Sequence, residues 1–261
     1  MQELVAANWE QALHHLFADT WQASLRRFRS TFAYRGVGSL HHALRTRLAR
    51  ITDDPAVIEQ HLLRNFRKYA EDRPEPRFDS VWHWLALAQH HGLPTRMLDW
   101  TYSPLVALHF VTESRQNFHD DGVVWCVDYV TAKKLLPRTL ADALDAEGAD
   151  VFTPELLGRT VKSFAELESV APESSLVFLE PPSLDQRIVT QYALFSFLTD
   201  GAGNMHDWVE SHPALCRKVV IAGRAKCEIR DQLDQANVTE RVLYPGLDGL
   251  CKWLARYYEQ R

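Results

Sequence analysis

The sequence predicts a single α+β domain in which small mixed or antiparallel sheets of short strands are surrounded by helices. Three observations predict this class. Hydrophobic residues make up 46% of the 261 residues and charged residues 24%, a balance typical of a chain that buries a sizeable core. Short runs of β-forming residues alternate with helical periodicity. No internal repeat or long linker divides the chain, so we expect one body with about five strands and six or seven helices.

The first 70 residues are predicted to be mostly helical. Apolar residues at spacings of three and four predict a helix from about Leu4 to Arg29, so residues 1–30 are expected to be an N-terminal helical segment. The run from Thr31 to Val37 is rich in β-formers and predicts a strand. Ser39 is expected to cap a helix through residues 41–50, and Pro55 suits the first turn of a third helix.

The middle and the end of the chain alternate helices with strands. Asp79 or Ser80 is expected to cap a helix that stops at Gly92, because glycine best adopts the left-handed conformation at a helix end. Pro94 disfavours helical backbone at the residue before it, so residues 93–102 are expected to be non-helical. Further helices are expected at 104–114, 226–236 and 246–258, and strands at 122–129, 175–180, 193–199 and 217–223.

Charge and cysteine usage exclude several classes of protein. The chain holds 29 Lys and Arg against 34 Asp and Glu, a formal charge of −5, which excludes a histone-like or polybasic-tail protein. No apolar run reaches the roughly 18 residues that span a bilayer, and residues 1–10 lack the features of a signal peptide. The sequence therefore predicts a cytoplasmic protein with no membrane partner. The cysteines, which lack a C-x-x-C pair, are expected to be reduced thiols in the core: Cys126, Cys216, Cys227 and Cys251.

Four histidines form one candidate site by composition, because neutral imidazoles are good zinc ligands: His83, His90, His91 and His109. Their spacing matches no familiar metal signature, since the chain lacks an H-E-x-x-H motif and any cysteine or carboxylate at a fixed short offset. Histidines that satisfy helix ends or form hydrogen bonds in a partly buried wall explain the pattern better. We therefore predict no metal site.

The segment HHGLPTRMLDWT, residues 90–101, crowds polar groups into a non-helical stretch between two apolar helices. Packing alone explains such a loop poorly, and exposed loops often carry binding residues. The structural alternative is a rigid turn in which Asp99 pairs with Arg96 and Trp100 fills the core. The residues alone leave both interpretations open.

Four segments of the chain resemble the FRG domain family, named for its Phe-Arg-Gly element. They are YRG at 34–36, LAQHHGLPTRMLDWTYSPLVALHF at 87–110, DQRIVTQYALFSF at 185–197 and LYPGLDGL at 243–250. Their order and separation fit nearly the whole chain from Phe32 onward, so residues 31–261 are expected to be one FRG domain. The chain departs from the family pattern at Val37, where glutamine is usual, and at Tyr192 and Ala193, where glutamine and glycine are usual.

The resemblance implies an ADP-ribosyltransferase-like fold and an enzyme that modifies a macromolecule, either protein or nucleic acid. NAD would be a consumed substrate and not a permanently bound cofactor. Bacterial toxins and phage-defence effectors are the implied setting, with an antitoxin or regulatory protein as an implied partner. In that superfamily three short elements meet at an NAD pocket, and the matching catalytic positions in this chain are Arg35, Thr101 (or Ser103) and Gln191.

The chemistry makes sense of these residue types. Arg35 offers a planar donor fork for a phosphate or a ribose hydroxyl, and Gly36 would let the ligand approach the backbone. Thr101 would orient the ribose, and Trp100 or Tyr102 would stack on nicotinamide. A surface, capping or core role is the alternative for each. The full set of predicted NAD-binding residues is Tyr34, Gly36, His90, Arg96, Asp99, Trp100 and Ser103.

Gln191 is chemically unusual in this role, because a neutral amide cannot stabilise an oxocarbenium-like cation as a carboxylate would. Three interpretations follow. Gln191 positions the substrate while Asp99, Glu180 or Asp185 supplies the carboxylate; the enzyme is slow and depends on its target; or the protein binds a nucleotide without turnover.

Two other classes of function compete with the transferase. A non-catalytic nucleotide or nucleic-acid binding module would use aromatic residues such as Trp82, Trp84 and Trp100. It would also use the basic first part of the chain, because residues 1–70 hold ten Lys and Arg against six Asp and Glu, which leaves +4. A metal-dependent hydrolase would use the four histidines. Neither a Rossmann nor a P-loop glycine motif occurs, so hydride transfer and ATP hydrolysis have no support.

Overall fold

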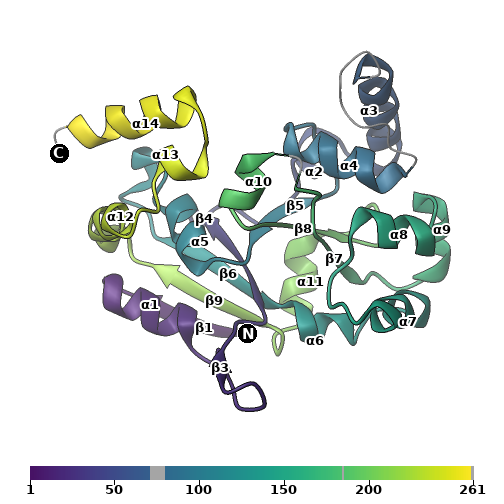
Figure 1. The fold of residues 1–261 in the computed structure, drawn as a ribbon, viewed down its shortest axis with the longest axis horizontal. Coiled ribbons are helices and arrows are strands. Elements are labelled where there is room, and N and C mark those ends of the chain that lie inside the picture. Colours follow the sequence, from purple (N-terminus) through teal and green to yellow (C-terminus); the bar gives the residue numbers. More distant parts are fainter. Residues whose placement is uncertain (71–79, 184, 260–261) are drawn as a thin grey trace.

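A single seven-stranded mixed sheet forms the centre of the computed structural model, which describes residues 1–70, 80–183 and 185–259 (Figure 1). Its strand order is β1-β9-β6-β4-β5-β8-β7, and only β1 and β9 run parallel. The predicted α+β class is therefore confirmed, with one large sheet in place of several small ones. The strands are β1 (Gln2–Ala6), β4 (Phe32–Val37), β5 (Leu98–Thr101), β6 (Gly122–Asp128), β7 (Leu176–Leu179), β8 (Ala193–Leu198) and β9 (Cys216–Ile221).

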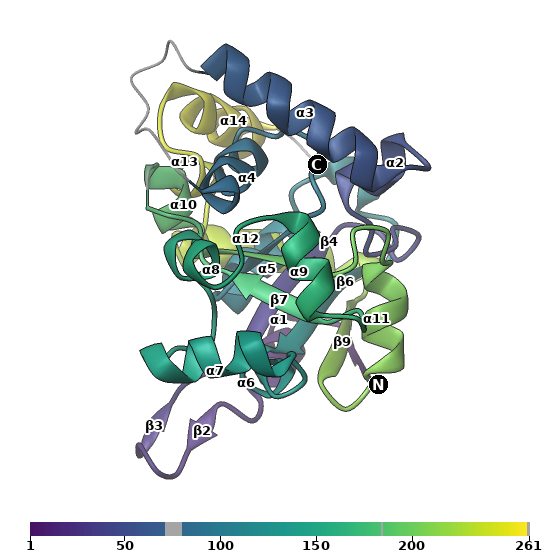
Figure 2. The same ribbon diagram turned by 90° about the vertical axis from the view of Figure 1, so that its right-hand side faces the viewer.

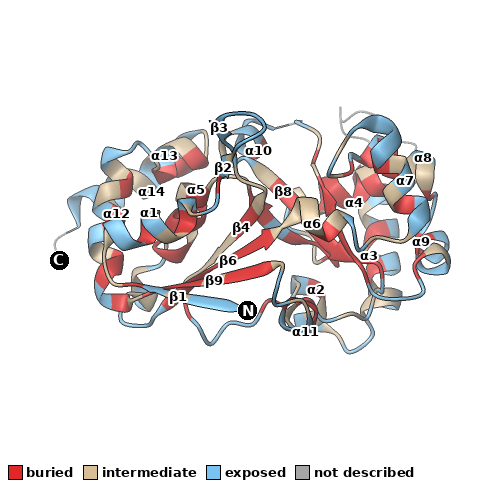
Figure 3. Cartoon of the chain, turned by 90° about the horizontal axis from the view of Figure 1, so that it is seen from below, coloured by how far each residue is buried: buried red, intermediate tan, exposed pale blue. Residues whose placement is uncertain are grey.

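Helices pack on both sides of this sheet (Figure 3). α1, α5 and α12 cover a core on the β1-β9-β6-β4 half, and α4 and α7 to α9 enclose a second core at the other half. The helices are α1 (Trp9–Phe17), α2 (Arg47–Ile51), α3 (Pro55–Ala70), α4 (Val81–His90), α5 (Pro104–Val111), α6 (Tyr129–Lys133), α7 (Arg138–Glu147), α8 (Pro154–Thr160), α9 (Phe164–Val170), α10 (Gln186–Thr190), α11 (Met205–Ser211), α12 (Lys226–Gln235), α13 (Glu240–Leu243) and α14 (Leu247–Tyr258).

The sheet is split between β4 and β5. β4 pairs with β6 along its whole length, from Phe32 to Val37. Its pairing with β5 is confined to one register position, where Tyr34 lies opposite Thr101. Beyond that position the strands separate, and β5 continues to pair with β8. The sheet therefore consists of two halves, β1-β9-β6-β4 and β5-β8-β7, which are joined at a single residue pair.

The predicted N-terminal helix from Leu4 to Arg29 is wrong outside α1 (Trp9–Phe17). Leu4 and Val5 lie in β1 and pair with Val219 and Val220 of β9, so sheet pairing overrides the helical spacing there. Helix α1 begins after the N-cap Asn8 and ends at Phe17. The rest of the segment is a hairpin of β2 (Trp21–Gln22) and β3 (Arg27–Phe28), which projects from the body at the end opposite α3 and α14 (Figures 1 and 2).

The predicted helix after Ser39 is also wrong over most of its length. The Ser39 hydroxyl accepts a hydrogen bond from the His41 amide in a turn, and α2 begins only after the N-cap Thr46. The five predicted strands are confirmed as β4, β6, β7, β8 and β9, whereas β1, β5 and the hairpin add strands that were not predicted. The described residues contain fourteen α-helices, about twice the predicted number, because four short helices fill residues 129–170.

Helix ends follow the expected chemistry more closely. Ser80 caps α4 by accepting a hydrogen bond from the Trp82 amide, and Gly92 adopts a φ of +79° after the helix. The alternative cap, Asp79, lies outside the described residues. Cys126 and Cys216 are buried as expected, whereas Cys227 is half-buried and Cys251 is exposed. Among the described residues, no helix has the length and apolar character needed to cross a membrane.

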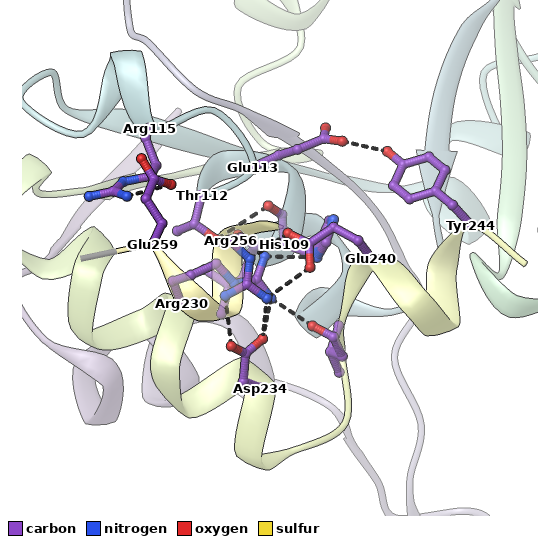
Figure 4. A network of polar contacts seen from close by, with 12 residues as sticks. His109, Thr112, Glu113, Arg115, Arg230, Asp234, Glu240, Tyr244, Arg256 and Glu259 are labelled. Carbon is purple, nitrogen blue, oxygen red and sulfur yellow. Dashed lines mark hydrogen bonds and ion pairs between the residues drawn. The ribbon is translucent and has the colours of Figure 1, made fainter. Parts of the chain in front are cut away.

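A polar network fastens the C-terminal helices to the body (Figure 4). The Arg256 guanidinium binds both carboxylate oxygens of Asp234 at 2.6 and 2.7 Å and both of Glu240 at 2.6 and 2.8 Å. Arg230 donates to Nδ1 of His109 at 2.8 Å, which joins α12 to α5. The Tyr244 hydroxyl donates to Glu113 at 2.8 Å. These charge-assisted bonds fix α13 and α14 in place.

The buried His109 makes stability depend on pH. Burial, reinforced by the neighbouring Arg230, lowers the pKa of His109 to about 3. An unfolded histidine titrates near pH 6.5, so between pH 6.5 and 3 the unfolded chain binds a proton that the folded chain does not. Stability therefore falls as the pH decreases through this range, by up to about 1.4 kcal/mol per pH unit. We expect H109Q to flatten this slope in urea unfolding at pH 7.5, 6 and 5; equal slopes for the two proteins would contradict the assignment.

Candidate functional site

A cavity of about 580 Å³ opens where β4 and β5 separate, and we call it the cleft. Its wall is formed by β4, β5, α2, the end of α4, α5, α10 and the start of β8. All three predicted catalytic residues line it: Arg35, Thr101 and Gln191. Of the predicted NAD-binding residues, it is lined by Tyr34, Gly36, His90, Asp99 and Trp100, but not by Arg96 or Ser103.

Arg35 occupies the split between the two halves of the sheet. If pairing continued past Tyr34, Gly36 would lie opposite Asp99; instead the Arg35 guanidinium donates to the main-chain carbonyl of Asp99. Burial lowers the pKa of Arg35, Asp99 opposes this effect, and Arg50 adds to it. An arginine keeps its charge at physiological pH, so the split holds a half-buried cation.

Thr101 and Gln191 are bound to each other. The Thr101 hydroxyl donates to the main-chain carbonyl of Gln191 at 2.7 Å and accepts from the Ser103 amide at 3.0 Å. The side-chain amide of Gln191 donates to the carbonyl of Leu243 at 2.9 Å. The segments around residues 101, 191 and 243 therefore meet at one edge of the cleft, although they are far apart in the sequence.

Two carboxylates lie in the cleft wall. Asp99 accepts a hydrogen bond from Gln89 at 2.9 Å, and Asp185 contacts Nε2 of His90 at 2.9 Å. The hydrogen bonds from the Arg187 amide and from His90 lower the pKa of Asp185, so it is ionised at neutral pH. The third predicted carboxylate, Glu180, does not line the cleft and accepts a hydrogen bond from Tyr102 at 2.7 Å.

The cleft also contains residues that the sequence did not assign to an NAD site. Their chemistry is cationic or aromatic: Arg47, Arg50, His91, Phe110 and Arg187. Arg47 donates to the Gly92 carbonyl at 2.8 Å and so fixes α2 against the turn after α4. The basic run RTRLAR, residues 45–50, was the available signal, but the predicted helix there gave no reason to place its arginines beside Arg35.

Arg96 has a structural position that contradicts both sequence-based interpretations of it. It does not pair with Asp99 and does not reach the cleft. Its Nε lies 2.5 Å from the Glu59 carboxylate, both side chains are buried, and the guanidinium lies 4.2 Å from the centre of the Phe164 ring. Arg96 therefore joins α3 to the second half of the sheet and cannot contact a ligand in the cleft.

Three other predicted binding residues are occupied by structural contacts. Tyr34 is buried, and its hydroxyl bonds to the Leu16 carbonyl and to Ser30. Trp100 is 3% exposed and donates to Ser196 at 2.7 Å, so it fills the core, as the structural alternative expected. Ser103 is the N-cap of α5. The rings of Tyr34 and Trp100 are therefore unable to stack on a ligand as they stand.

Gly36 is required by packing against α5. A Cβ atom at this position would lie 1.9 Å from the main-chain oxygen of Ala107 in α5. Because this neighbour is backbone, G36A must displace α5, and we expect it to destabilise the fold by at least about 1–3 kcal/mol in urea unfolding. A second change, A107G, is expected not to restore stability, since the carbonyl remains. Wild-type stability of G36A would contradict this packing.

The candidate histidines are dispersed. His83 contacts Glu155 and His109 binds Arg230, whereas His90 and His91 border the cleft. Within residues 1–70, 80–183 and 185–259, no group of three or more His, Cys, Asp or Glu side chains is placed to hold a metal. The prediction that aromatic residues of a binding module contact nucleic acid is also wrong, because the three tryptophans named for it are buried: Trp82, Trp84 and Trp100.

Comparison with known families identifies the part of the chain that forms most of the cleft. Residues 30–120 match the family model of the FRG domain. The chain contains an FRG domain. This FRG domain supplies Arg35, Asp99 and Thr101 to the cleft, whereas Gln191 lies outside the matched residues. No curated protein and no solved structure matches the chain significantly.

Proposed function

We propose that this protein is an ADP-ribosyltransferase-like enzyme that consumes NAD to modify a macromolecule, as a bacterial toxin or phage-defence effector. The convergence of Arg35, Thr101 and Gln191 on one cleft carries the proposal. They belong to three separate segments, and the resemblance to the transferase superfamily requires such segments to meet at the NAD pocket. A cleft of about 580 Å³ falls within the range of cofactor sites.

The proposed reaction is a displacement at C1 of the ribose that bears nicotinamide. The bond between C1 and the nicotinamide nitrogen breaks, and its electron pair leaves with neutral nicotinamide. A nucleophile of the acceptor forms the new bond to C1 and loses a proton. The products are ADP-ribosyl acceptor, nicotinamide and one proton. The transition state resembles an oxocarbenium ion, so nearby negative charge stabilises it.

The cleft supplies groups suited to each part of this chemistry. Arg35, Arg50 and Arg187 offer cationic donors for the pyrophosphate. Asp99 and Asp185 offer negative charge for the developing cation. This agrees with the interpretation in which one of these aspartates, and not Gln191, stabilises the cation. Gln191 would position the ribose, because its amide is fixed by Leu243 and its carbonyl by Thr101. Phe110 is the partly exposed aromatic residue placed to contact a base.

The second candidate function is nucleotide binding without turnover. The observation that favours it is the neutral Gln191, whose amide is already occupied by the Leu243 carbonyl. Calorimetric titration with NAD, combined with a chromatographic assay for nicotinamide release in a cell lysate, distinguishes the two. Binding with release supports the enzyme, binding without release supports the module, and absence of both contradicts the cleft as an NAD site.

A further inference from the structure

A second cavity of about 580 Å³ lies outside the cleft, between α3 and the start of α9. We call it the basic groove. Its lining residues come from α3, the first residue of α4, the α8–α9 link and the first two residues of α9: Gln60, Leu63, Arg64, Arg67, Lys68, Val81, Lys162, Ser163, Phe164 and Ala165. It shares none of these residues with the cleft.

The charge of the groove is of one sign. Four of its lining residues are cations and none is a carboxylate: Arg64, Arg67, Lys68 and Lys162. All four are exposed, and none forms an ion pair with another described residue. The protein as a whole carries −5, so this concentration of positive charge is local. Such a groove attracts a ligand with several closely spaced negative charges.

The floor of the groove shows how that ligand is held. Leu63 and Phe164 are buried beneath the cations. The Arg96 guanidinium already covers the Phe164 ring at 4.2 Å, and the Arg67 guanidinium lies 5.6 Å from the Trp84 ring centre. The neighbouring aromatic rings are therefore occupied by arginines, and the groove contacts its ligand through charge and not through base stacking. This is the chemistry that recognises a phosphodiester backbone without regard to sequence.

The groove and the cleft are connected by one helix. Val81 at the start of α4 lines the groove, and His90 at its end lines the cleft. A helix of this length spans about 15 Å, so a strand of a few nucleotides reaches from one site to the other. α2, which carries Arg47 and Arg50 into the cleft, packs against α3, which carries the groove cations.

From these observations we propose that the basic groove binds the phosphate backbone of a nucleic-acid strand and thereby presents that strand to the cleft as the acceptor. The presentation rests on the proposed transferase function, whereas the binding does not. An acidic protein is the competing ligand, but regularly repeated phosphates match a groove that four cations line and no described carboxylate lines.

The test compares two variants of equal charge change. The groove variant R64Q/K68Q/K162Q removes three exposed cations and leaves the Arg67–Trp84 contact intact. The control variant R26Q/R27Q/R29Q removes three exposed cations from the hairpin, at the opposite end of the molecule from α3 (Figures 1 and 2). Fluorescence anisotropy measures binding of mixed-sequence 12-nucleotide RNA and DNA, and of a 12-residue polyglutamate, from 50 to 300 mM NaCl.

We expect the groove variant to bind the oligonucleotides at least 10-fold more weakly than wild type at 100 mM NaCl, with the control unchanged. The slope of log affinity against log salt should decrease by about 2, since each single-strand phosphate contact contributes about 0.7. Equal binding by both variants, or tighter binding of polyglutamate than of the oligonucleotides, would overturn the proposal.

Labelled NAD separates this inference from the proposed function. One outcome supports both the groove and the transferase. In it, wild type transfers label to the oligonucleotide, the groove variant transfers at least 10-fold less, and the two proteins release nicotinamide equally in the absence of an acceptor. Groove-dependent binding without NAD turnover would leave the binding site standing and refute the transferase. Label that enters protein alone, or enters oligonucleotide equally with the groove variant, would refute the groove as the acceptor site.

Discussion

Replacing Arg96 with methionine is expected to destabilise the fold by about 3–5 kcal/mol, because it leaves the buried Glu59 carboxylate without its cation. The Glu59 oxygens accept from the Arg96 main-chain amide at 2.6 Å and from Nε at 2.5 Å. R96M retains only the main-chain bond. Urea unfolding of wild type and R96M measures the difference in free energy directly.

The double variant E59L/R96M is the matched control for this prediction. Removing both charges relieves the unpaired carboxylate, so the double variant should be more stable than R96M alone. If R96M instead kept wild-type stability and lost affinity for NAD, Arg96 would have the ligand-binding role that the sequence predicted. The ion pair with Glu59 would then not explain why an arginine occupies this position.

Replacing Arg35 with alanine is expected to reduce NAD turnover by about 100- to 1000-fold, the range typical when one preorganised hydrogen-bond donor of an active site is removed. Arg35 is half-buried in the split of the sheet and bonds to the Asp99 carbonyl, so its cation is fixed before any ligand enters. R35K keeps the charge but loses the planar fork, so we expect it to restore little of the rate. Nicotinamide release measured by chromatography gives the turnover of each variant.

Stability must be measured beside turnover for these variants, since Arg35 also links β4 to β5. Equal unfolding midpoints would assign the lost turnover to the cleft. An R35A protein that folds and turns over NAD at the wild-type rate would contradict the assigned role. A variant that fails to fold would be replaced by R50Q, because Arg50 lines the same cleft from α2 and carries no hydrogen bond across the split of the sheet.

The elements that the sequence predicted well are those whose signals are local. β6, β8 and β9 are rich in valine, phenylalanine and leucine, and Ser80 and Gly92 bound α4 through local backbone chemistry. The N-terminal segment failed because β1 depends on pairing with β9, more than 200 residues away. β5 was recognised only as non-helical, since a strand of four residues carries too little pattern.

The candidate site was predictable in outline through the family resemblance. That resemblance placed Arg35, Thr101 and Gln191 together, and all three line the cleft. The failures concern residues whose partners lie far away in the sequence. Arg96 is explained by Glu59, and Gly36 by Ala107. No local pattern in the sequence reveals such contacts, because they depend on how α3 and α5 pack against the sheet.

The decisive experiment for NAD-dependent transfer is incubation of the purified protein with NAD labelled in its adenine moiety and a cell lysate. Protein and nucleic acid are separated before counting, and R35A serves as the control. We expect label in a macromolecular fraction with wild type, enriched in nucleic acid, and its loss with R35A. Absence of label from every macromolecular fraction, with NAD left intact, would contradict the proposed function.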